Sequence, residues 1–168
     1  MKIHLLSREL AAVIPSVDGG PAWNGGVEKW RRYLAEHEAG RRHTLVALED
    51  NEPVAYGSVI WSSGYGGFTA AGIPEISDLV VATAFRRNGV GTRVMEALER
   101  LAIKEGYSIV GLGVGLYADY GDAQRLYCRR GYIPDGCGLM TSDGAVAPGA
   151  RVLVDDDLVI YLIKSLAR

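Results

Sequence analysis

The sequence has little cysteine, little histidine and no long apolar run, and each shortage excludes a class of protein. Its two cysteines, Cys128 and Cys137, and its three histidines fit no metal-ligand spacing, so neither a disulfide scaffold nor a metal centre is expected. No apolar stretch approaches the ~20 residues that a membrane-spanning helix needs. The N-terminus lacks a secretory pattern, since Arg8 and Glu9 interrupt its apolar start. We therefore expect a cytoplasmic protein with free thiols.

An excess of charge of one sign is also missing. The chain has 18 basic and 20 acidic residues, which gives a formal net charge of −2. A basic excess is typical of nucleic-acid-binding and membrane-surface proteins, so neither kind of partner is expected. What the chain does have is 168 residues with 48% hydrophobic content, enough to bury roughly 70% of the unfolded surface. We expect a single domain over residues 1–168.

The spacing of apolar and turn residues predicts strands and helices along the whole chain. Strands are expected at 2–6, 44–48, 53–61, 75–82, 108–114, 132–133, 139–141 and 158–163, and helices at 8–14, 27–39, 90–105 and 121–130. The glycine-rich stretch 62–72 is expected to be a loop, either a substrate lid or a plain surface loop. The strand–helix–strand unit over 75–114 implies parallel neighbouring strands, so the expected fold class is mixed α/β.

The most informative stretch follows the strand expected at 75–82 and opens the helix expected at 90–105. Glycines there let backbone N–H groups approach an anion without a Cβ in the way. These N–H groups lie where a helix leaves its first donors unpaired and its dipole positive. With two arginines added, the stretch is suited to binding a phosphate or pyrophosphate. The residues expected to hold the anion are Arg86, Arg87, Asn88, Gly89, Val90, Gly91 and Thr92.

The spacing Arg-x-x-Gly-x-Gly, formed by Arg86, Gly89 and Gly91, resembles a signature of the GNAT superfamily of N-acetyltransferases. Residues 123–132, AQRLYCRRGY, resemble a second block of that superfamily, Ala-x-x-Leu-Tyr-x-x-x-Gly-aromatic. The two blocks occur in the family's order, separated by a helix and a strand, and the match covers about residues 75–135. One departure is Tyr120, because many members have an asparagine at this position, three residues before the alanine.

The resemblance implies a twisted mixed sheet with helices on both faces, in which two central parallel strands splay apart and hold acetyl-CoA. The splayed strands would be those at 75–82 and 108–114. The pantetheine arm would pair with backbone groups of Leu79 and Val81, as a peptide pairs with a strand edge. The pyrophosphate would meet the amides of residues 87–92.

Acetyl transfer to an amine needs a neutral amine, a stabilised oxyanion and a protonated leaving group. By resemblance, Tyr127 is the acid near the sulfur, since a phenol with a pKa of about 10 keeps its proton at pH 7. The alternative is that Tyr127 is a core aromatic residue packed under the cofactor. The oxyanion would meet a backbone N–H of Val80 or its neighbour.

Glu75 and Asp78 are the candidates for the general base. Strand alternation puts them on opposite faces, so at most one would point into the acceptor site. Either could instead be a surface residue or a strand-end partner, and a water chain without a single base is another alternative. The acidic run 155–157 could attract a cationic acceptor or form a solvated loop.

The expected function is transfer of an acetyl group from acetyl-CoA to a primary amine of a small molecule, with coenzyme A as product. A non-catalytic acyl-CoA-binding sensor and an acetyltransferase for peptide or protein amines remain alternatives. Another acyl chain, such as succinyl or propionyl, also remains open. Because open-edged sheets can pair, a homodimer is a further expectation.

Overall fold

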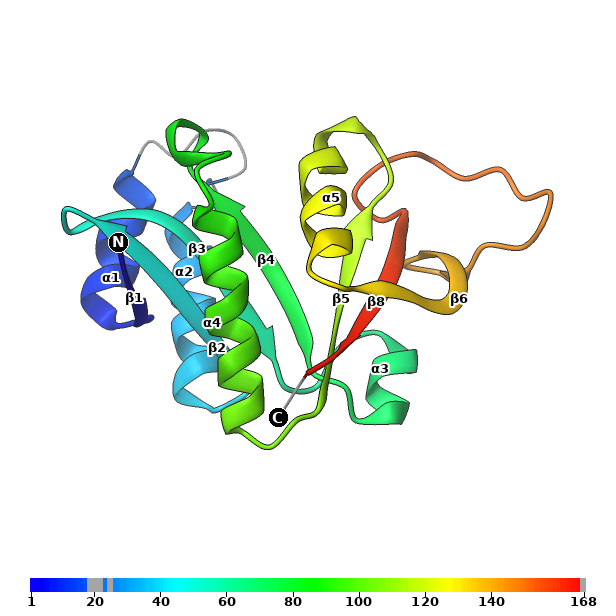
Figure 1. Cartoon of the computed structure of the whole chain (residues 1–168), viewed down its shortest axis with the longest axis horizontal. Coiled ribbons are helices and arrows are strands. Elements are labelled where there is room, and N and C mark those ends of the chain that lie inside the picture. Colours follow the sequence, from blue (N-terminus) through cyan, green and yellow to red (C-terminus); the bar gives the residue numbers. More distant parts are fainter. Residues whose placement is uncertain (18–22, 24–25, 167–168) are drawn as a thin grey trace.

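Strands from the whole length of the chain form one mixed sheet in the computed structural model, which describes residues 1–17, 23 and 26–166 (Figure 1). The strand order is β1-β2-β3-β4-β5-β8-β6-β7, and only β4 and β5 are parallel neighbours among the described strands. The bounds are Lys2–Leu5 for β1, Arg42–Glu49 for β2, Glu52–Ile60 for β3, Glu75–Val81 for β4, Ile109–Gly115 for β5, Ile133–Thr141 for β6, Gly144–Ala145 for β7 and Val159–Ser165 for β8. The predicted mixed α/β class is confirmed.

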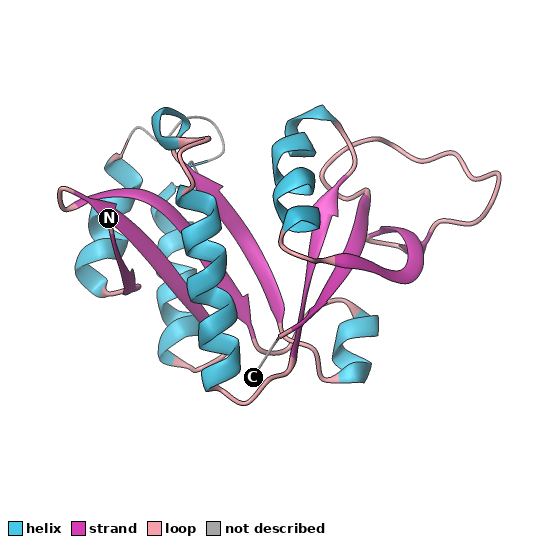
Figure 2. Cartoon of the chain, viewed as in Figure 1, coloured by secondary structure: helices cyan, strands magenta, loops and turns pink. Residues whose placement is uncertain are grey.

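Helices cover both faces of this sheet. Figure 2 shows α4 and α5 on the near face, while α2 lies behind the strands. The helices are α1 (Arg8–Val13), α2 (Gly26–Glu38), α3 (Gly66–Ala71), α4 (Val90–Lys104) and α5 (Gly121–Arg129), with short 3₁₀ turns at Ile14–Ser16, Thr83–Phe85 and Ala118–Tyr120. No helix in the described ranges is long and apolar enough to span a membrane.

The stretch 62–72, predicted to be a loop, contains the helix α3. Phe68 is the only residue of this helix that is buried, so the sequence shows no apolar period there. The helix is stabilised by tertiary packing instead, because the Phe68 ring lies directly over Gly111, where a Cβ would be 2.2 Å from the ring. The two-residue strand β7 was not predicted either, since so short an element leaves no pattern.

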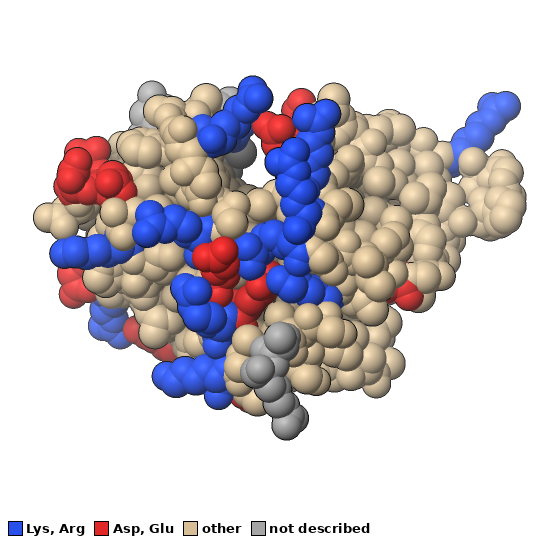
Figure 3. Space-filling view, viewed as in Figure 1, with Lys and Arg blue, Asp and Glu red and all other residues tan. Residues whose placement is uncertain are grey.

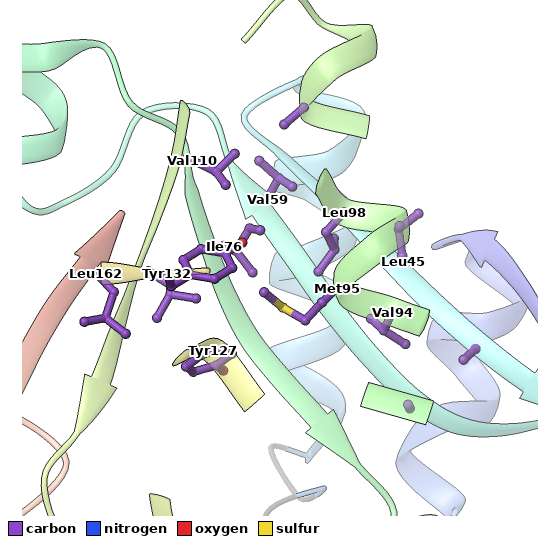
Figure 4. Packing of buried hydrophobic residues seen from close by; sticks show 14 of the residues in the cluster. Leu45, Val59, Ile76, Val94, Met95, Leu98, Val110, Tyr127, Tyr132 and Leu162 are labelled. Carbon is purple, nitrogen blue, oxygen red and sulfur yellow. The ribbon is translucent and has the colours of Figure 1, made fainter. Parts of the chain in front are cut away.

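The apolar side chains form one core on each face of the sheet. On the near face, Val94 and Leu98 of α4 are fully buried and pack toward the sheet residues Val59 and Ile76 (Figure 4). This cluster continues across β5 to Tyr127 and Tyr132. The core on the far face is aromatic and includes Trp23, Trp30, Tyr33 and Tyr56.

One buried carboxylate connects the two halves of the near face. Glu99 of α4 is 7% exposed and accepts hydrogen bonds from the Arg130 guanidinium at 2.7 and 3.1 Å. It also accepts from Lys164 Nζ at 2.8 Å and from the Tyr132 hydroxyl at 3.1 Å. Arg130 follows α5 and Lys164 belongs to β8, so these bonds join α4 to the half of the molecule that contains α5.

Candidate functional site

The central feature of the candidate site is a gap between β4 and β5. These strands share one register pair, Glu75 with Gly111, and beyond it β4 pairs with β3 while β5 pairs with β8. Figure 1 shows the two strands diverging from that point toward the top of the view. The predicted splay of the central parallel strands is confirmed, and it leaves one edge of β4 without a strand neighbour among the described residues.

The direction of the backbone decides which groups of β4 face this gap. The Ala82 N–H donates to the Val54 carbonyl of β3 at 2.9 Å, and alternate residues of a strand direct their polar groups to the same side. Val80 therefore directs its N–H toward β3, whereas Leu79 and Val81 direct theirs into the gap. Because the Val80 N–H points toward β3, it is not available to a ligand in the gap. An oxyanion donor on this part of β4 would have to be the N–H of Leu79 or Val81.

The loop between β4 and α4 presents free backbone donors. Gly89 is the N-cap of α4 with a φ of 77°, a left-handed conformation that favours glycine. Arg87 is also left-handed, with a φ of 64°. The N–H groups of residues 87–92 donate to no acceptor in the part of the chain that the structure describes. Consecutive free N–H groups at a helix N-terminus form a concave anion site.

The Arg86 side chain, expected to contact the anion directly, makes a hydrogen bond within the chain. Its Nε–H donates to the Val81 carbonyl at 3.0 Å, so the side chain holds the loop against the end of β4. The guanidinium is exposed and keeps its other N–H donors for a ligand.

Positive charge surrounds the gap on the near face. Figure 3 shows Lys and Arg side chains gathered over α4 and α5, on both sides of a notch between them. The exposed arginines of the loop and these two helices are Arg86, Arg87, Arg93, Arg100, Arg125 and Arg129. The notch is therefore suited to a ligand that carries several negative charges.

Tyr127 lies on α5 in the near-face core and is 8% exposed. It belongs to the cluster that includes Leu79 and Val81 at the gap edge of β4. Burial raises the pKa of the Tyr127 phenol to about 12. Its hydroxyl has no hydrogen-bond partner among the described residues, and burial is the cause of the raised pKa.

A β-bulge at Asp78 changes the expected arrangement of the two carboxylates. The register of β3 and β4 shifts between Tyr56 and Ser58, and Asp78 has a φ of 56°. As a result Ile76 and Leu79, three residues apart, both pack into the near-face core. Glu75 and Asp78 therefore lie together on the far face, and the prediction that they lie on opposite faces is wrong because it assumed an unbroken strand.

Glu75 accepts fewer hydrogen bonds than Asp78. Its Oε2 accepts a hydrogen bond from the Ser63 hydroxyl at 2.5 Å, and Ser63 Oγ accepts the Tyr65 N–H at 2.9 Å. Burial raises the pKa of the Glu75 carboxyl, and the nearby charge of Asp78 adds to this effect. A partly buried carboxyl whose pKa is raised and whose hydrogen-bond partner is neutral is suited to accepting a proton.

Asp78 is bound by groups from α2 and β2. Its Oδ2 accepts hydrogen bonds from the Tyr33 hydroxyl and from Arg42 Nη1, the latter at 3.1 Å. Arg42 is 8% exposed and also donates from Nε to Glu36 at 2.6 Å. Next to this network, Lys29 Nζ donates to the Tyr56 hydroxyl at 2.8 Å, and burial lowers the pKa of Lys29.

The alternating glycines of β5 are each covered by an aromatic ring. Phe68 covers Gly111, and the Tyr161 ring lies over Gly113, where a Cβ would be 3.1 Å away. Tyr120, at the position of the family's asparagine, covers Gly115 and donates its hydroxyl to Asp156 at 2.9 Å. The glycines therefore allow close approach of the chain's own rings.

A pocket of about 530 Å³ adjoins this aromatic surface. Residues of 64–67 and 137–145 line it, together with Tyr161. Tyr65 stacks on Tyr161 with ring centroids 3.7 Å apart and donates its hydroxyl to Asp135 at 2.9 Å. The volume falls in the range of about 300–1,000 Å³ that small-molecule sites occupy.

Several residues of the site could not be found by sequence reasoning. Tyr33 of α2, Arg42 of β2 and Ser63, in the segment after β3, donate hydrogen bonds to Glu75 or Asp78. None of them belongs to a motif, and their sequence separation from β4 carries no signal. The φ of Asp78, which places Glu75 and Asp78 on the same face of the sheet, could not be predicted from the sequence either.

Comparisons with known proteins agree with this geometry. The model of the Acetyltransferase (GNAT) family matches residues 17–132. No curated protein matches the chain.

Solved structures with low sequence identity share the fold. Ribosomal-protein-alanine N-acetyltransferase from Brucella melitensis is 20% identical, with a TM-score of 0.68 over 99% of this chain and 100% of that one. An aminoglycoside 6'-N-acetyltransferase complexed with coenzyme A is 18% identical, with a TM-score of 0.68 over 100% and 98% of the two chains. A protein from Salmonella typhimurium assigned as an acetyltransferase, solved with its cofactor acetyl-CoA, is 20% identical, with a TM-score of 0.69 over 100% and 95%.

Proposed function

Since the chain belongs to the Acetyltransferase (GNAT) family, we propose that it transfers an acetyl group from acetyl-CoA to a primary amine of a small molecule. The observation that carries this proposal is the gap between β4 and β5, which combines a free strand edge, free N–H donors at 87–92 and the buried phenol of Tyr127. Amides of a pantetheine arm suit the strand edge, and a pyrophosphate suits the helix N-terminus.

Bound acetyl-CoA supplies an activated thioester, and the residues of this chain supply the proton transfers. Glu75 takes a proton from the acceptor ammonium, so that the neutral nitrogen can form a bond with the acetyl carbonyl carbon. The N–H of Leu79 or Val81 donates to the carbonyl oxygen as negative charge develops on it. Tyr127 donates its phenolic proton to the sulfur as the carbon–sulfur bond breaks, which leaves coenzyme A as the thiol. The nitrogen loses its second proton as the amide forms, and this proton returns the Tyr127 phenolate to the phenol, so that only the proton on Glu75 is released to solvent.

The proposal is tested by titrating the purified protein with acetyl-CoA in a calorimeter and then measuring thiol release with a panel of primary amines. Saturable binding and amine-dependent release are the expected results. Binding without release from any amine would favour an acyl-CoA sensor, and absence of binding would contradict the cofactor assignment. Parallel titrations with succinyl-CoA and propionyl-CoA show which acyl chain is preferred.

Replacing Glu75 by glutamine is expected to lower kcat/KM by about 100-fold at neutral pH, because the amine loses its proton acceptor. In the wild type, kcat/KM rises with pH through the pKa of Glu75, which lies above the ordinary glutamate value. The variant is expected to lose this part of the pH profile. Thermal unfolding checks the fold. A raised folded pKa means that ionisation of Glu75 costs stability as the pH rises through it, so the uncharged variant should be at least as stable at neutral pH.

The control for this variant is Glu28→Gln, on an exposed side chain of α2, and it should leave the profile unchanged. If Glu75→Gln keeps the wild-type profile and Asp78→Asn loses it, the role of base belongs to Asp78. If both variants keep the profile, a water chain without a single base is favoured.

A further inference from the structure

A projecting segment, residues 151–155, holds apolar side chains in solvent. Figure 1 shows the chain between β6 and β8 looping away from the sheet, at the right of the view. Val152, Leu153 and Val154 in this loop are 40%, 76% and 61% exposed. No large hydrophobic side chain among the described residues is more exposed than that of Leu153. Three consecutive exposed apolar residues are unusual on the surface of a monomer and are typical of an interaction site.

The backbone of the projecting segment also lacks partners. The segment follows a turn at 147–150, in which the Ala150 N–H donates to the Ala147 carbonyl at 3.1 Å and Gly149 has a φ of 82°. Residues 151–154 belong to no helix or strand, and their N–H and carbonyl groups form no backbone hydrogen bond with any described residue. A row of free backbone groups beside apolar side chains can pair with another strand.

The loop is attached to the rest of the protein on both sides of the projecting segment. Before it, the Val146 N–H donates to the Leu139 carbonyl of β6 at 2.9 Å. After it, the Asp156 carboxylate accepts hydrogen bonds from the hydroxyls of Tyr117 and Tyr120, the latter at 2.9 Å. A segment anchored in this way loses less conformational freedom on pairing than a free tail does.

The sequence of the projecting segment is complementary to itself in the antiparallel direction. Residues 151–155 read RVLVD, with a cation at one end, a carboxylate at the other and apolar residues between them. When two copies pair antiparallel about Leu153, Arg151 of each copy lies opposite Asp155 of the other. Val152 then lies opposite Val154. Opposite charges and β-branched side chains stabilise such directly opposed positions.

Both charges of this pattern are available for pairing. Arg151 is exposed and forms no ion pair within the described ranges. Asp155 accepts one hydrogen bond, from the Asp157 N–H at 3.0 Å, and this neutral donor leaves the charge of the carboxylate uncompensated. Pairing of two copies would join the opposite charges and cover the apolar residues between them.

We propose that residues 151–155 of two copies of this chain pair as antiparallel strands about a twofold axis at Leu153, and that this ribbon forms a homodimer. Such an interface is isologous, because the same residues contribute on both sides. A ribbon of this length buries much less than the ~1,600 Å² of a standard interface, so the dimer is weak and its population depends on protein concentration. The inference does not depend on the proposed acetyl transfer, since none of these residues lines the pocket or belongs to the strands that form the gap.

Sedimentation equilibrium of the full chain, from micromolar to near-millimolar concentration, measures the dimer. A reversible monomer–dimer equilibrium is expected for the wild type. Leu153→Asp is expected to raise its dissociation constant by at least about tenfold, because two carboxylates then lie opposite each other at the axis. Leu5→Asp is the matched control, since Leu5 is 47% exposed on β1, at the other end of the strand order, and it should dimerise like the wild type.

Charge reversal tests the register. Arg151→Asp and Asp155→Arg each place like charges opposite each other in a homodimer, and each is expected to raise the dissociation constant by at least about tenfold. An equimolar mixture of the two variants is expected to dimerise like the wild type, because every pair in the mixed dimer again joins opposite charges. A wild type that stays monomeric at every concentration would overturn the inference, and so would an unchanged dimer in Leu153→Asp. Failure of the mixture to dimerise, with both variants folded by circular dichroism, would overturn it as well.

Discussion

Replacing Tyr127 by phenylalanine is expected to lower kcat by about 100- to 1,000-fold, because the leaving sulfur loses its proton donor. The affinity for acetyl-CoA should hardly change, since the ring keeps its place in the core. The fold should also be retained, because the hydroxyl that is removed has no hydrogen-bond partner among the described residues. Measurements of kcat and of the calorimetric Kd for acetyl-CoA separate these effects.

The pKa of Tyr127 leads to a second, independent prediction for the same residue, which concerns the pH dependence of kcat. Because burial raises this pKa to about 12, the phenol stays protonated at pH values where an ordinary tyrosine begins to ionise. Tyr127 should therefore cause no fall in wild-type kcat between pH 8 and 10. A decline in that range that is absent from Tyr127→Phe would show that the phenol ionises earlier than its burial implies.

The control for Tyr127→Phe is Tyr107→Phe. Tyr107 follows α4 and stacks on Trp61 with ring centroids 5.4 Å apart, so the substitution removes a phenol hydroxyl that is not part of the site. It should leave kcat unchanged. If kcat is also unchanged in Tyr127→Phe, Tyr127 is a core aromatic residue and has no part in the mechanism.

Sequence reasoning predicted the strand, loop and helix of the proposed cofactor site because these elements are contiguous. The strand, the glycine loop and the helix lie within residues 75–105, and local rules connect each to the next. The apolar period predicts α4, and the glycines predict that the backbone N–H groups at its start are accessible. What the local rules could not give was the direction of the Arg86 side chain, which depends on the position of the Val81 carbonyl.

The acceptor side was predicted less well, for a physical reason. It depends on one backbone angle, the φ of Asp78, which moves that carboxylate to the same face as Glu75. The bulge is stabilised by long-range contacts, above all the hydrogen bonds from Tyr33 and Arg42. Such contacts join residues 36 or more positions apart, and a single sequence does not contain the information that pairs them.

Replacing Glu99 by glutamine is expected to reduce the free energy of unfolding by about 3 kcal/mol at neutral pH. The carboxylate is the shared acceptor of Arg130, Lys164 and Tyr132, and all these residues are largely buried. A neutral amide would leave Lys164 without its counter-charge and Arg130 with only the half-exposed carboxylate of Glu96. Chemical denaturation at pH 7, with wild type and variant side by side, measures this loss.

The pKa of Glu99 predicts how the stability difference between wild type and Glu99→Gln changes with pH. Burial by itself would raise the pKa of Glu99, but the hydrogen bonds from Arg130 and Lys164 outweigh burial and hold it below the ordinary value. A depressed folded pKa means that the stabilisation is present above the unfolded pKa and is lost as the pH falls through the folded one. The difference between wild type and Glu99→Gln should therefore shrink in acid.

Glu96→Gln is the matched control, because Glu96 is one turn away on α4 and binds the same arginine. Its side chain is 45% exposed and makes one contact with Arg130 at 3.2 Å, so the expected loss is at most about 1 kcal/mol. Equal losses in the two variants would contradict a special role for Glu99. A larger loss at Glu99 would mean that this carboxylate helps to hold together two halves whose central strands pair at only one register position.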